Sequence, residues 1–573
     1  MRGVKMKKLV SIFLSVVLIA SSVSVGAFAA QNSTELTFAV ASDLHYTLPE
    51  EEITGEIDDE IYWYANRRAA MENESGWIID EFLNQCAEND DCEFVLISGD
   101  IVQNGRRVIQ EHYDMAAKFA EFEKKTGKQI YVTVGNHDAG KDSETDVEDF
   151  KRIYADFGYN EALTVDEDTC SYTADLNEKY RLISLDSCDH TKSTEDGMTA
   201  EKLDWVRRQA EQAKKDGKYP ILMMHHNLLD HMPLQRVFSK NFIVKFHYNT
   251  AELFANWGIK IVLTGHEHCS DATSYTSAAG NVIYDFATTS LTMYPLQYRM
   301  FSLTDDEIKY EVKTVDSIDT DSLTARVSGY SEKQTDLMNS GLNAYAKGFL
   351  KAGVKYRLLR SLSDEKMGIS EEDFYYDLVK TAVEGLCKIL EEPLYGENSV
   401  SALAREYNIE IPESEYENGW DVATELVAAH YAGGESFELD STEVTIFLRL
   451  VVLVLRDDLA LVGDEVLLKS ANEIFKIFGT DSVIADLTKL GTKVFGAVSP
   501  VEYFLLALVS PIIYNFAVDS DGVDDNSGVL PGYGTRSLKN NCLNVVEKIN
   551  GIFDDATKYA SMFLVYIMKI IYG

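Results

Sequence analysis

Five short polar motifs interrupt the first half of this chain, and each one follows a short apolar run of strand-like composition. The motifs are Asp43-Leu44-His45, Gly99-Asp100, Gly135-Asn136-His137-Asp138, His225-His226 and Gly265-His266-Glu267-His268. The runs that precede them are LTFAVAS, FVLIS, IYVTV, PILMM and IKIVLT. Because open α/β sheets gather ligand groups beyond the carboxyl ends of their strands, we expect these side chains to meet at one edge of a sheet.

The side chains of these motifs are carboxylates, imidazoles and an amide, which suit Zn, Fe, Mn and similar ions. Their number is sufficient for two ions. Residues i and i+2 of an extended chain face the same side, so we expect Asp43 to face an ion together with His45, and His266 together with His268. Asp100 has no such partner, and its carboxylate can bridge two ions. A water between those ions would lose a proton near neutral pH.

Each motif taken alone is also typical of an ordinary turn, because Gly, Asn and Asp favour turn geometry. The complete set, in order and with each member after an apolar run, favours the metal site instead. Within the pair of adjacent histidines, we expect His225 rather than His226 to be the ligand, because His225 follows the apolar run directly. In a strand, His226 would face the other way.

Over roughly residues 36–314, the motifs resemble those of the calcineurin-like metallophosphoesterase superfamily. The resemblance implies an α/β fold, a four-layer αββα sandwich, with two divalent or mixed-valence ions of Fe, Mn or Zn. It implies a first metal held by Asp43, His45, Asp100 and His268, and a second held by Asp100, Asn136, His225 and His266. It also implies that His137 contacts the phosphate and helps to protonate the leaving group.

Two positions depart from particular branches of this superfamily. Gln103 stands three residues after Asp100, where purple acid phosphatases carry tyrosine. Asp138 follows Gly-Asn-His, where the 5′-nucleotidase branch usually carries glutamate. Both differences disfavour those branches, and the subfamily stays open.

The first 29 residues have the pattern of a secretory signal peptide. Four basic residues precede the apolar run LVSIFLSVVLIA, and Ala27-Phe28-Ala29 supplies a small-x-small cleavage pattern. The alternative is an uncleaved membrane anchor, but the apolar run is short for a span of about 20 residues. We therefore expect a secreted protein, extracellular or in the cell envelope.

Length and periodicity divide the remaining chain into two expected domains, 30–315 and 316–573. Short strands alternate with helical patterns in the first. Apolar residues recur at helical spacing in the second, over 333–352, 371–391, 420–432, 440–478 and 536–570, which predicts an all-α C-terminal domain. Apolar runs at 447–455 and 501–518 are expected to be buried core helices rather than membrane spans.

Together these features predict a secreted, metal-dependent hydrolase of small-molecule phosphomonoesters or phosphodiesters. A net charge of −40 argues against nucleic-acid binding through bulk electrostatics. The alternative is a non-catalytic or membrane-surface binding protein that uses the helical domain; a membrane surface is the less favoured partner. The seven cysteines do not resemble a disulfide framework, and Cys170 could pair with Cys188, although free thiols are favoured. The sequence leaves the oligomeric state open.

The cleavage pattern predicts that the mature chain begins at about Ala30, because Ala27 and Ala29 fill the small-residue positions before the cut. N-terminal sequencing of the exported protein measures this directly. An intact Met1 end on that material would contradict the prediction.

Overall fold

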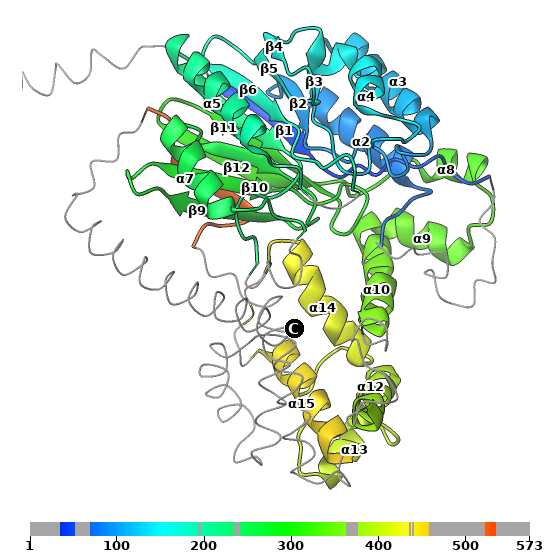
Figure 1. Cartoon of the computed structure of the whole chain (residues 1–573). Coiled ribbons are helices and arrows are strands. Elements are labelled where there is room, and N and C mark those ends of the chain that lie inside the picture. Colours follow the sequence, from blue (N-terminus) through cyan, green and yellow to red (C-terminus); the bar gives the residue numbers. More distant parts are fainter. Residues whose placement is uncertain are drawn as a thin grey trace, which may run out of the picture.

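The structure is a computed structural model that describes residues 35–51, 69–192, 196–232, 235, 241–361, 376–434, 437, 441–457 and 522–534. Two β-sheets pack face to face, and helices cover their outer faces (Figure 1). This arrangement confirms the four-layer αββα sandwich that the resemblance implies. The expected signal peptide lies outside the described residues.

The first sheet has the strand order β13-β12-β11-β1-β2-β3. Its strands are β1 (Leu36–Ala41), β2 (Phe94–Ile97), β3 (Gln129–Val132), β11 (Gln297–Leu303), β12 (Glu307–Thr314) and β13 (Ser527–Pro531). Strands β1, β2 and β3 are parallel. Parallel neighbours need a crossover, which helices α2 (Ser75–Glu88) and α3 (Ile109–Thr126) provide.

The second sheet has the strand order β4-β5-β6-β7-β8-β10-β9. Its strands are β4 (Thr164–Val165), β5 (Tyr172–Asp175), β6 (Tyr180–Leu185), β7 (Tyr219–Met224), β8 (Ile261–Thr264), β9 (Asp271–Thr276) and β10 (Val282–Ala287). Strands β6, β7, β8 and β10 are parallel, and helices α5 (Ala200–Lys215) and α7 (His247–Trp257) make two of the crossovers. Helix α4 (Val147–Ile153) and the π-helical turn η1 (Ala155–Tyr159) follow β3.

Aromatic side chains fill the space between the two sheets. The Phe38 ring stacks on Phe94 and Phe301, with centroids 5.1 and 5.3 Å apart, and Phe286 of the opposite sheet meets Phe301 edge-on at 5.0 Å. Alternate residues of β1 face the other way, where Ala39 packs in the cluster that includes α2 and α3. Burial on both faces explains why the strands are continuous apolar runs.

Helices dominate the region after β12. They are α8 (Thr320–Arg326), α9 (Glu332–Ser340), α10 (Leu342–Ser361), α12 (Tyr376–Glu391), α13 (Val400–Glu406), α14 (Gly419–Tyr431) and α15 (Thr442–Asp457). Helices α12 to α15 share a hydrophobic core of their own, which includes Leu448, Leu450 and residues 451–454 of the run expected at 447–455. No helix among the described residues is long and apolar enough to cross a membrane. The helices expected at 501–518, 536–570 and beyond residue 457 lie outside the described residues.

One segment of the expected all-α region is a strand instead. Residues 527–531 form β13, which pairs antiparallel with β12 and becomes the edge of the first sheet. The Lys260 side chain donates to the carbonyls of Pro531 (3.1 Å) and Gly532 (2.7 Å), which ties the returning chain to the second sheet. A five-residue strand carries too short a pattern to be recognised beside long helical repeats.

Buried His112 supplies a pH-dependent contribution to stability. Its Nε2 donates to the Asp138 carbonyl, so Nδ1 accepts from the Tyr154 hydroxyl and the ring is neutral. Burial lowers the pKa of His112 to about 4, from an ordinary value of 6.5. Between pH 6.5 and 4 the unfolded chain therefore binds more protons, so this contribution is present at pH 7 and is lost as the pH falls.

We predict that the stability difference between wild type and His112→Gln is largest at pH 7, and that acidification to pH 4 reduces it by about 3 kcal/mol. Glutamine retains a donor for the Asp138 carbonyl but does not titrate. Urea unfolding of both proteins from pH 7 to pH 4 gives the difference. A difference that does not change with pH would contradict the prediction.

Candidate metal centre

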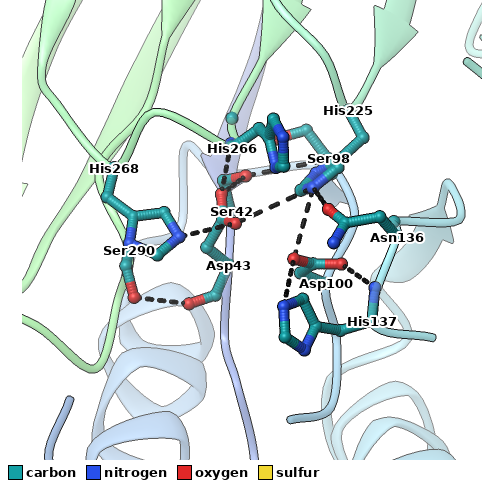
Figure 2. Close-up of polar contacts among 12 residues, drawn as sticks. Ser42, Asp43, Ser98, Asp100, Asn136, His137, His225, His266, His268 and Ser290 are labelled. Carbon is teal, nitrogen blue, oxygen red and sulfur yellow. Dashed lines mark hydrogen bonds and ion pairs between the residues drawn. The ribbon is translucent and has the colours of Figure 1, made fainter. Parts of the chain in front are cut away.

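The strands of both sheets bring the five motifs to one edge of the sandwich. Asp43 and His45 follow β1, Asp100 follows β2, and Asn136 with His137 follows β3. In the second sheet, His225 follows β7, while His266 and His268 follow β8. Figure 2 shows the side chains that it labels from this set gathered at one place: Asp43, Asp100, Asn136, His137, His225, His266 and His268. The structure therefore brings together all seven candidate ligands and His137.

One group of ligand atoms lies between β1 and β8. The Nε2 atom of His268 is 3.1 Å from Asp43 Oδ1 and 3.2 Å from His45 Nε2, and the latter is 3.6 Å from Asp43 Oδ1. Ligand atoms about 2.0–2.1 Å from a tetrahedral ion lie about 3.3–3.4 Å from one another. These three atoms thus have the mutual spacing of metal ligands.

A second group lies between β2, β3 and β7. Here His225 Nε2 is 3.3 Å from Asp100 Oδ2 and 3.0 Å from Asn136 Oδ1. The His266 ring is 4.7 Å from that of His225, and these two histidines and Asp100 also form a group that could hold an ion. The same Asp100 Oδ2 is 3.9 Å from His45 Nε2 of the first group. One carboxylate oxygen therefore lies between the two groups.

The reason expected for this convergence was wrong, although the convergence itself occurs. Asp43 and His45 are not extended: their φ angles are +49° and +43°. His266 and His268 have φ angles of +68° and +67°. The left-handed conformation costs non-glycine residues roughly 1–3 kcal/mol each. The side chains converge because the chain turns sharply just after each strand, not because the strand pleat continues.

Two motif glycines are required by close approach. A Cβ atom on Gly135 would lie 2.1 Å from both the backbone nitrogen and Oδ1 of Asp100. A Cβ on Gly265 would lie 1.8 Å from Ser42 Oγ and 2.4 Å from Asp43 Oδ2. Both distances are far below any van der Waals contact, so only glycine allows these loops to pass so near the carboxylates.

Hydrogen bonds from neighbouring groups orient the candidate ligands. The Ser98 carbonyl is 3.0 Å from His225 Nδ1, so that nitrogen carries the proton and Nε2 is left for an ion. Asp43 Oδ2 accepts from Ser42 Oγ (2.6 Å) and from the backbone N–H of His266 (2.9 Å), which leaves Oδ1 directed at His45 and His268. This pattern is typical of the groups that surround metal ligands.

The electrostatics of the cluster fit bound cations. Burial alone would raise the pKa values of Asp43 and Asp100, but the adjacent imidazoles, chiefly His268 and His225 respectively, hold both well below the usual range. Burial alone would lower the pKa of His225, but Asp100 and Asp43 raise it to about 9. Asp43 Oδ1 and His266 Nε2 are buried without a hydrogen-bond partner. Buried carboxylate oxygens and imidazole nitrogens that face one another are a donor set suited to divalent ions.

His137 and His226 both lie beside the candidate ligands, and His137 also forms a possible metal-holding group with His45 and Asp100. The Nδ1 atom of His137 donates to the Gln103 carbonyl at 2.8 Å, and its Nε2 lies 4.0 Å from Asp100 Oδ2. The His137 ring therefore points its second nitrogen at the centre. His226 Nδ1 is hydrogen-bonded to Ser187 Oγ at 2.9 Å, outside both groups. This geometry agrees with the choice of His225 over His226.

Sequence reasoning missed one side chain at the site. The ring of Phe242 stacks on His266, with centroids 4.3 Å apart and planes 27° apart. It reaches this position because the Phe242 and Asn227 backbones are hydrogen-bonded, Asn227 N–H donating to the Phe242 carbonyl at 3.0 Å. Nothing in the local sequence marks this phenylalanine, which follows no strand and belongs to no motif.

Comparison with known proteins places the site in a family. Residues 36–270 match the family model described as calcineurin-like phosphoesterase. Similar solved structures include a dimetal phosphatase from Danio rerio (11% identity, TM-score 0.35, covering 49% of this chain and 96% of that chain). Another is the NAD nucleotidase of Haemophilus influenzae (11% identity, TM-score 0.27, 57% and 60%). No curated protein matches the chain. At these values the solved structures carry no conclusion about activity.

Residues 36–270 therefore match the calcineurin-like phosphoesterases, and this match supports a metal-dependent hydrolase of phosphoric esters. The matched range contains all five motifs. The Asp and His groups that could bind metal lie within it as well.

The close approach at Gly135 gives a direct test of the centre. Because a methyl group there would collide with the Asp100 backbone and carboxylate, we predict that Gly135→Ala loses most of its bound metal. Gly341→Ala is the matched control, since a Cβ there meets nothing within 4 Å. Metal analysis after extensive dialysis measures the effect. Equal metal content in both variants would show that Asp100 does not hold the ions.

Proposed function

We propose that this protein is an exported phosphoesterase that uses two metal ions to hydrolyse small-molecule phosphomonoesters or phosphodiesters. The observation that carries the proposal is the position of Asp100. Its Oδ2 lies 3.9 Å from a ligand atom of the first group and 3.3 Å from one of the second. A carboxylate shared in this way is what a two-metal centre requires.

The two ions would be held by the residues of the two groups. Asp43, His45 and His268 would hold the first, Asn136, His225 and His266 the second, and Asp100 both. Carboxylate and imidazole donors suit Fe, Mn or Zn, as divalent or mixed-valence ions. When bound, such ions supply Lewis acidity to the phosphoryl oxygens and lower the pKa of a water.

The protein's own groups would orient the substrate and handle its leaving group. His137 stands beside the centre with Nδ1 fixed by the Gln103 carbonyl, so its Nε2 is the nitrogen that faces the centre. In the imidazolium form, which carries a proton on each nitrogen, Nε2–H can donate to a phosphoryl oxygen or to the departing oxygen. Its side chain is 19% exposed, against 0–1% for Asp43, Asp100 and His225. A more accessible imidazole is the group best placed to exchange protons with solvent.

A substrate panel tests this proposal. The purified protein, reconstituted separately with Fe, Mn and Zn, would be assayed on a bis-aryl phosphate, an aryl phosphate and nucleotides. We expect turnover that depends on added metal and is nearly abolished in Asp100→Asn. Wild-type activity that survives exhaustive chelation would refute a metal mechanism. Vesicle sedimentation of the same protein separates a soluble-substrate enzyme from one that works on a membrane surface.

The position of His137 predicts a dependence on the leaving group. A poor alkoxide leaving group needs a proton, whereas a nitrophenolate leaves unaided, and a positioned acid contributes typically 10²–10⁴-fold. We predict that His137→Ala keeps both ions and loses far more activity on alkyl phosphoesters than on nitrophenyl esters. Equal losses on both substrates would assign His137 to phosphate positioning. Loss of an ion would make it a ligand.

A further inference from the structure

The loop that carries His137 is held from outside by a row of donors. The backbone N–H of Arg106 donates to the His137 carbonyl at 3.2 Å, and His112 Nε2 donates to the Asp138 carbonyl at 2.9 Å. The next carbonyl, that of Ala139, accepts from Arg106 Nε at 2.9 Å and lies 3.2 Å from His190 Nδ1. Three consecutive carbonyls after Asn136 are therefore fixed by groups from other parts of the chain.

His190 differs from the other donors because both of its ring nitrogens face acceptors. Its Nδ1 faces the Ala139 carbonyl, and its Nε2 lies 2.8 Å from Asp186 Oδ2. A carbonyl oxygen has no proton to give, and an ionised carboxylate has none either. Both nitrogens can make their bonds only if both carry protons, which is the imidazolium form.

The Asp186 carboxylate is built to stay ionised. It is fully buried at the end of β6, and its oxygens accept from the backbone N–H groups of Cys170 and Cys188, both at 3.0 Å. Burial would raise the pKa of Asp186, but His190, Lys202 and these hydrogen bonds outweigh burial and lower it. Burial would likewise lower the pKa of His190, and Asp186 raises it above the ordinary value.

The remaining charged and titratable groups around His190 come from three other elements. Lys202 of α5 lies 3.6 Å from Asp186 Oδ1 and opposes the charge on His190. Arg106, after β2, donates to the His190 carbonyl at 3.0 Å. The buried Cys170 thiol lies near Asp186 and His190, and burial raises its pKa, so it stays protonated. His190 itself is therefore the group whose protonation decides the contact with the Ala139 carbonyl.

These contacts do not make a third metal site. Asp186, His190 and Cys170 are spaced as possible ligands. However, each Asp186 oxygen already accepts a backbone N–H. The Lys202 ammonium, 3.6 Å from Asp186 Oδ1, would also repel a cation bound here. The cluster is a charge pair directed at the His137 loop.

We propose that His190, held as an imidazolium by Asp186, is a positioning residue for the loop that carries Asn136 and His137. The proposal rests on the function proposed above. When His190 loses its proton, one of its nitrogens presents a lone pair to an acceptor, and an attraction becomes a repulsion. The positioning is thus present below the pKa of His190 and is lost as the pH rises through it.

Two substitutions shift this equilibrium in opposite directions. Asp186→Asn removes the anion that stabilises the imidazolium, so it should lower the pKa of His190. Lys202→Met removes a cation that opposes it, so it should raise that pKa. His190→Gln has no titrating ring, so its activity should not follow this titration.

The test combines histidine-selective NMR with pH profiles of kcat/KM on the metal-loaded full chain. A nitrophenyl ester is the substrate, because its leaving group does not need the proton of His137. We expect kcat/KM to decrease at basic pH with a midpoint that matches the His190 titration. This midpoint should move to lower pH in Asp186→Asn and to higher pH in Lys202→Met. The decrease should be absent in His190→Gln. The His190 resonance is assigned by its absence in His190→Gln. If Asp186→Asn does not fold, Lys202→Met decides.

A His190 pKa at or below 6.5 in wild type would overturn the proposal. So would a basic limb of the kcat/KM profile whose midpoint does not shift in either Asp186→Asn or Lys202→Met. The amide shifts of Ala139 and Gly140 provide a readout that needs no activity: they should titrate together with the His190 ring. If no substrate is turned over at any pH, the proposed function fails. The ring and amide titrations would still decide whether His190 positions the loop.

Discussion

The site depends on a single buried carboxylate. Asp100 contacts most of the loops that form the centre: its Oδ1 accepts the His137 N–H at 2.7 Å, its carbonyl accepts the His45 N–H at 3.0 Å, and its Oδ2 faces His225. Its backbone is left-handed, with φ of +48°. A charge buried in this way is tolerable only where it is paired. The surrounding imidazoles provide that pairing, and bound cations would complete it.

The sandwich supplies the geometry that this carboxylate needs. Parallel strands of both sheets end at one edge, so short loops from β1, β2, β3, β7 and β8 can reach a common centre. The aromatic layer between the sheets, in which Phe286 meets Phe301 edge-on, packs the two sheets against each other beneath it. The left-handed residues lie in loops that are anchored to these packed sheets. The surrounding structure therefore holds them in an unfavourable backbone conformation.

The motifs and their place at strand ends could be predicted from the sequence, because ligand type and apolar runs are local signals. The loop geometry could not be predicted in this way. Asp43 and His45 converge through positive φ angles, which the identity of these residues does not indicate. Phe242 and His190 were missed for a different reason, since their roles come from contacts with His266 and Ala139, which are distant in sequence. Strand β13 was missed because its partner β12 lies some two hundred residues earlier.

The helical region is physically joined to the metal loop rather than merely attached to the chain. Ser270, two residues after His268, donates its backbone N–H to the carbonyl of Tyr431 at the end of α14 (3.0 Å). Arg299 of β11 is fully buried and bonds both Ser270 Oγ (2.9 Å) and the Asp525 carbonyl (2.5 Å).

Asn526 makes the remaining contacts between Ser270 and the helical region. Its side chain accepts from Ser270 Oγ at 3.2 Å and donates to the Ala432 and Gly433 carbonyls at 3.0 and 2.9 Å. The backbone just after His268 is thus fixed from three directions: by α14, by the 522–534 segment and by β11. A force that displaced α14 would act first on Ser270, and through it on a candidate metal ligand. The helical region is for this reason part of the framework of the centre.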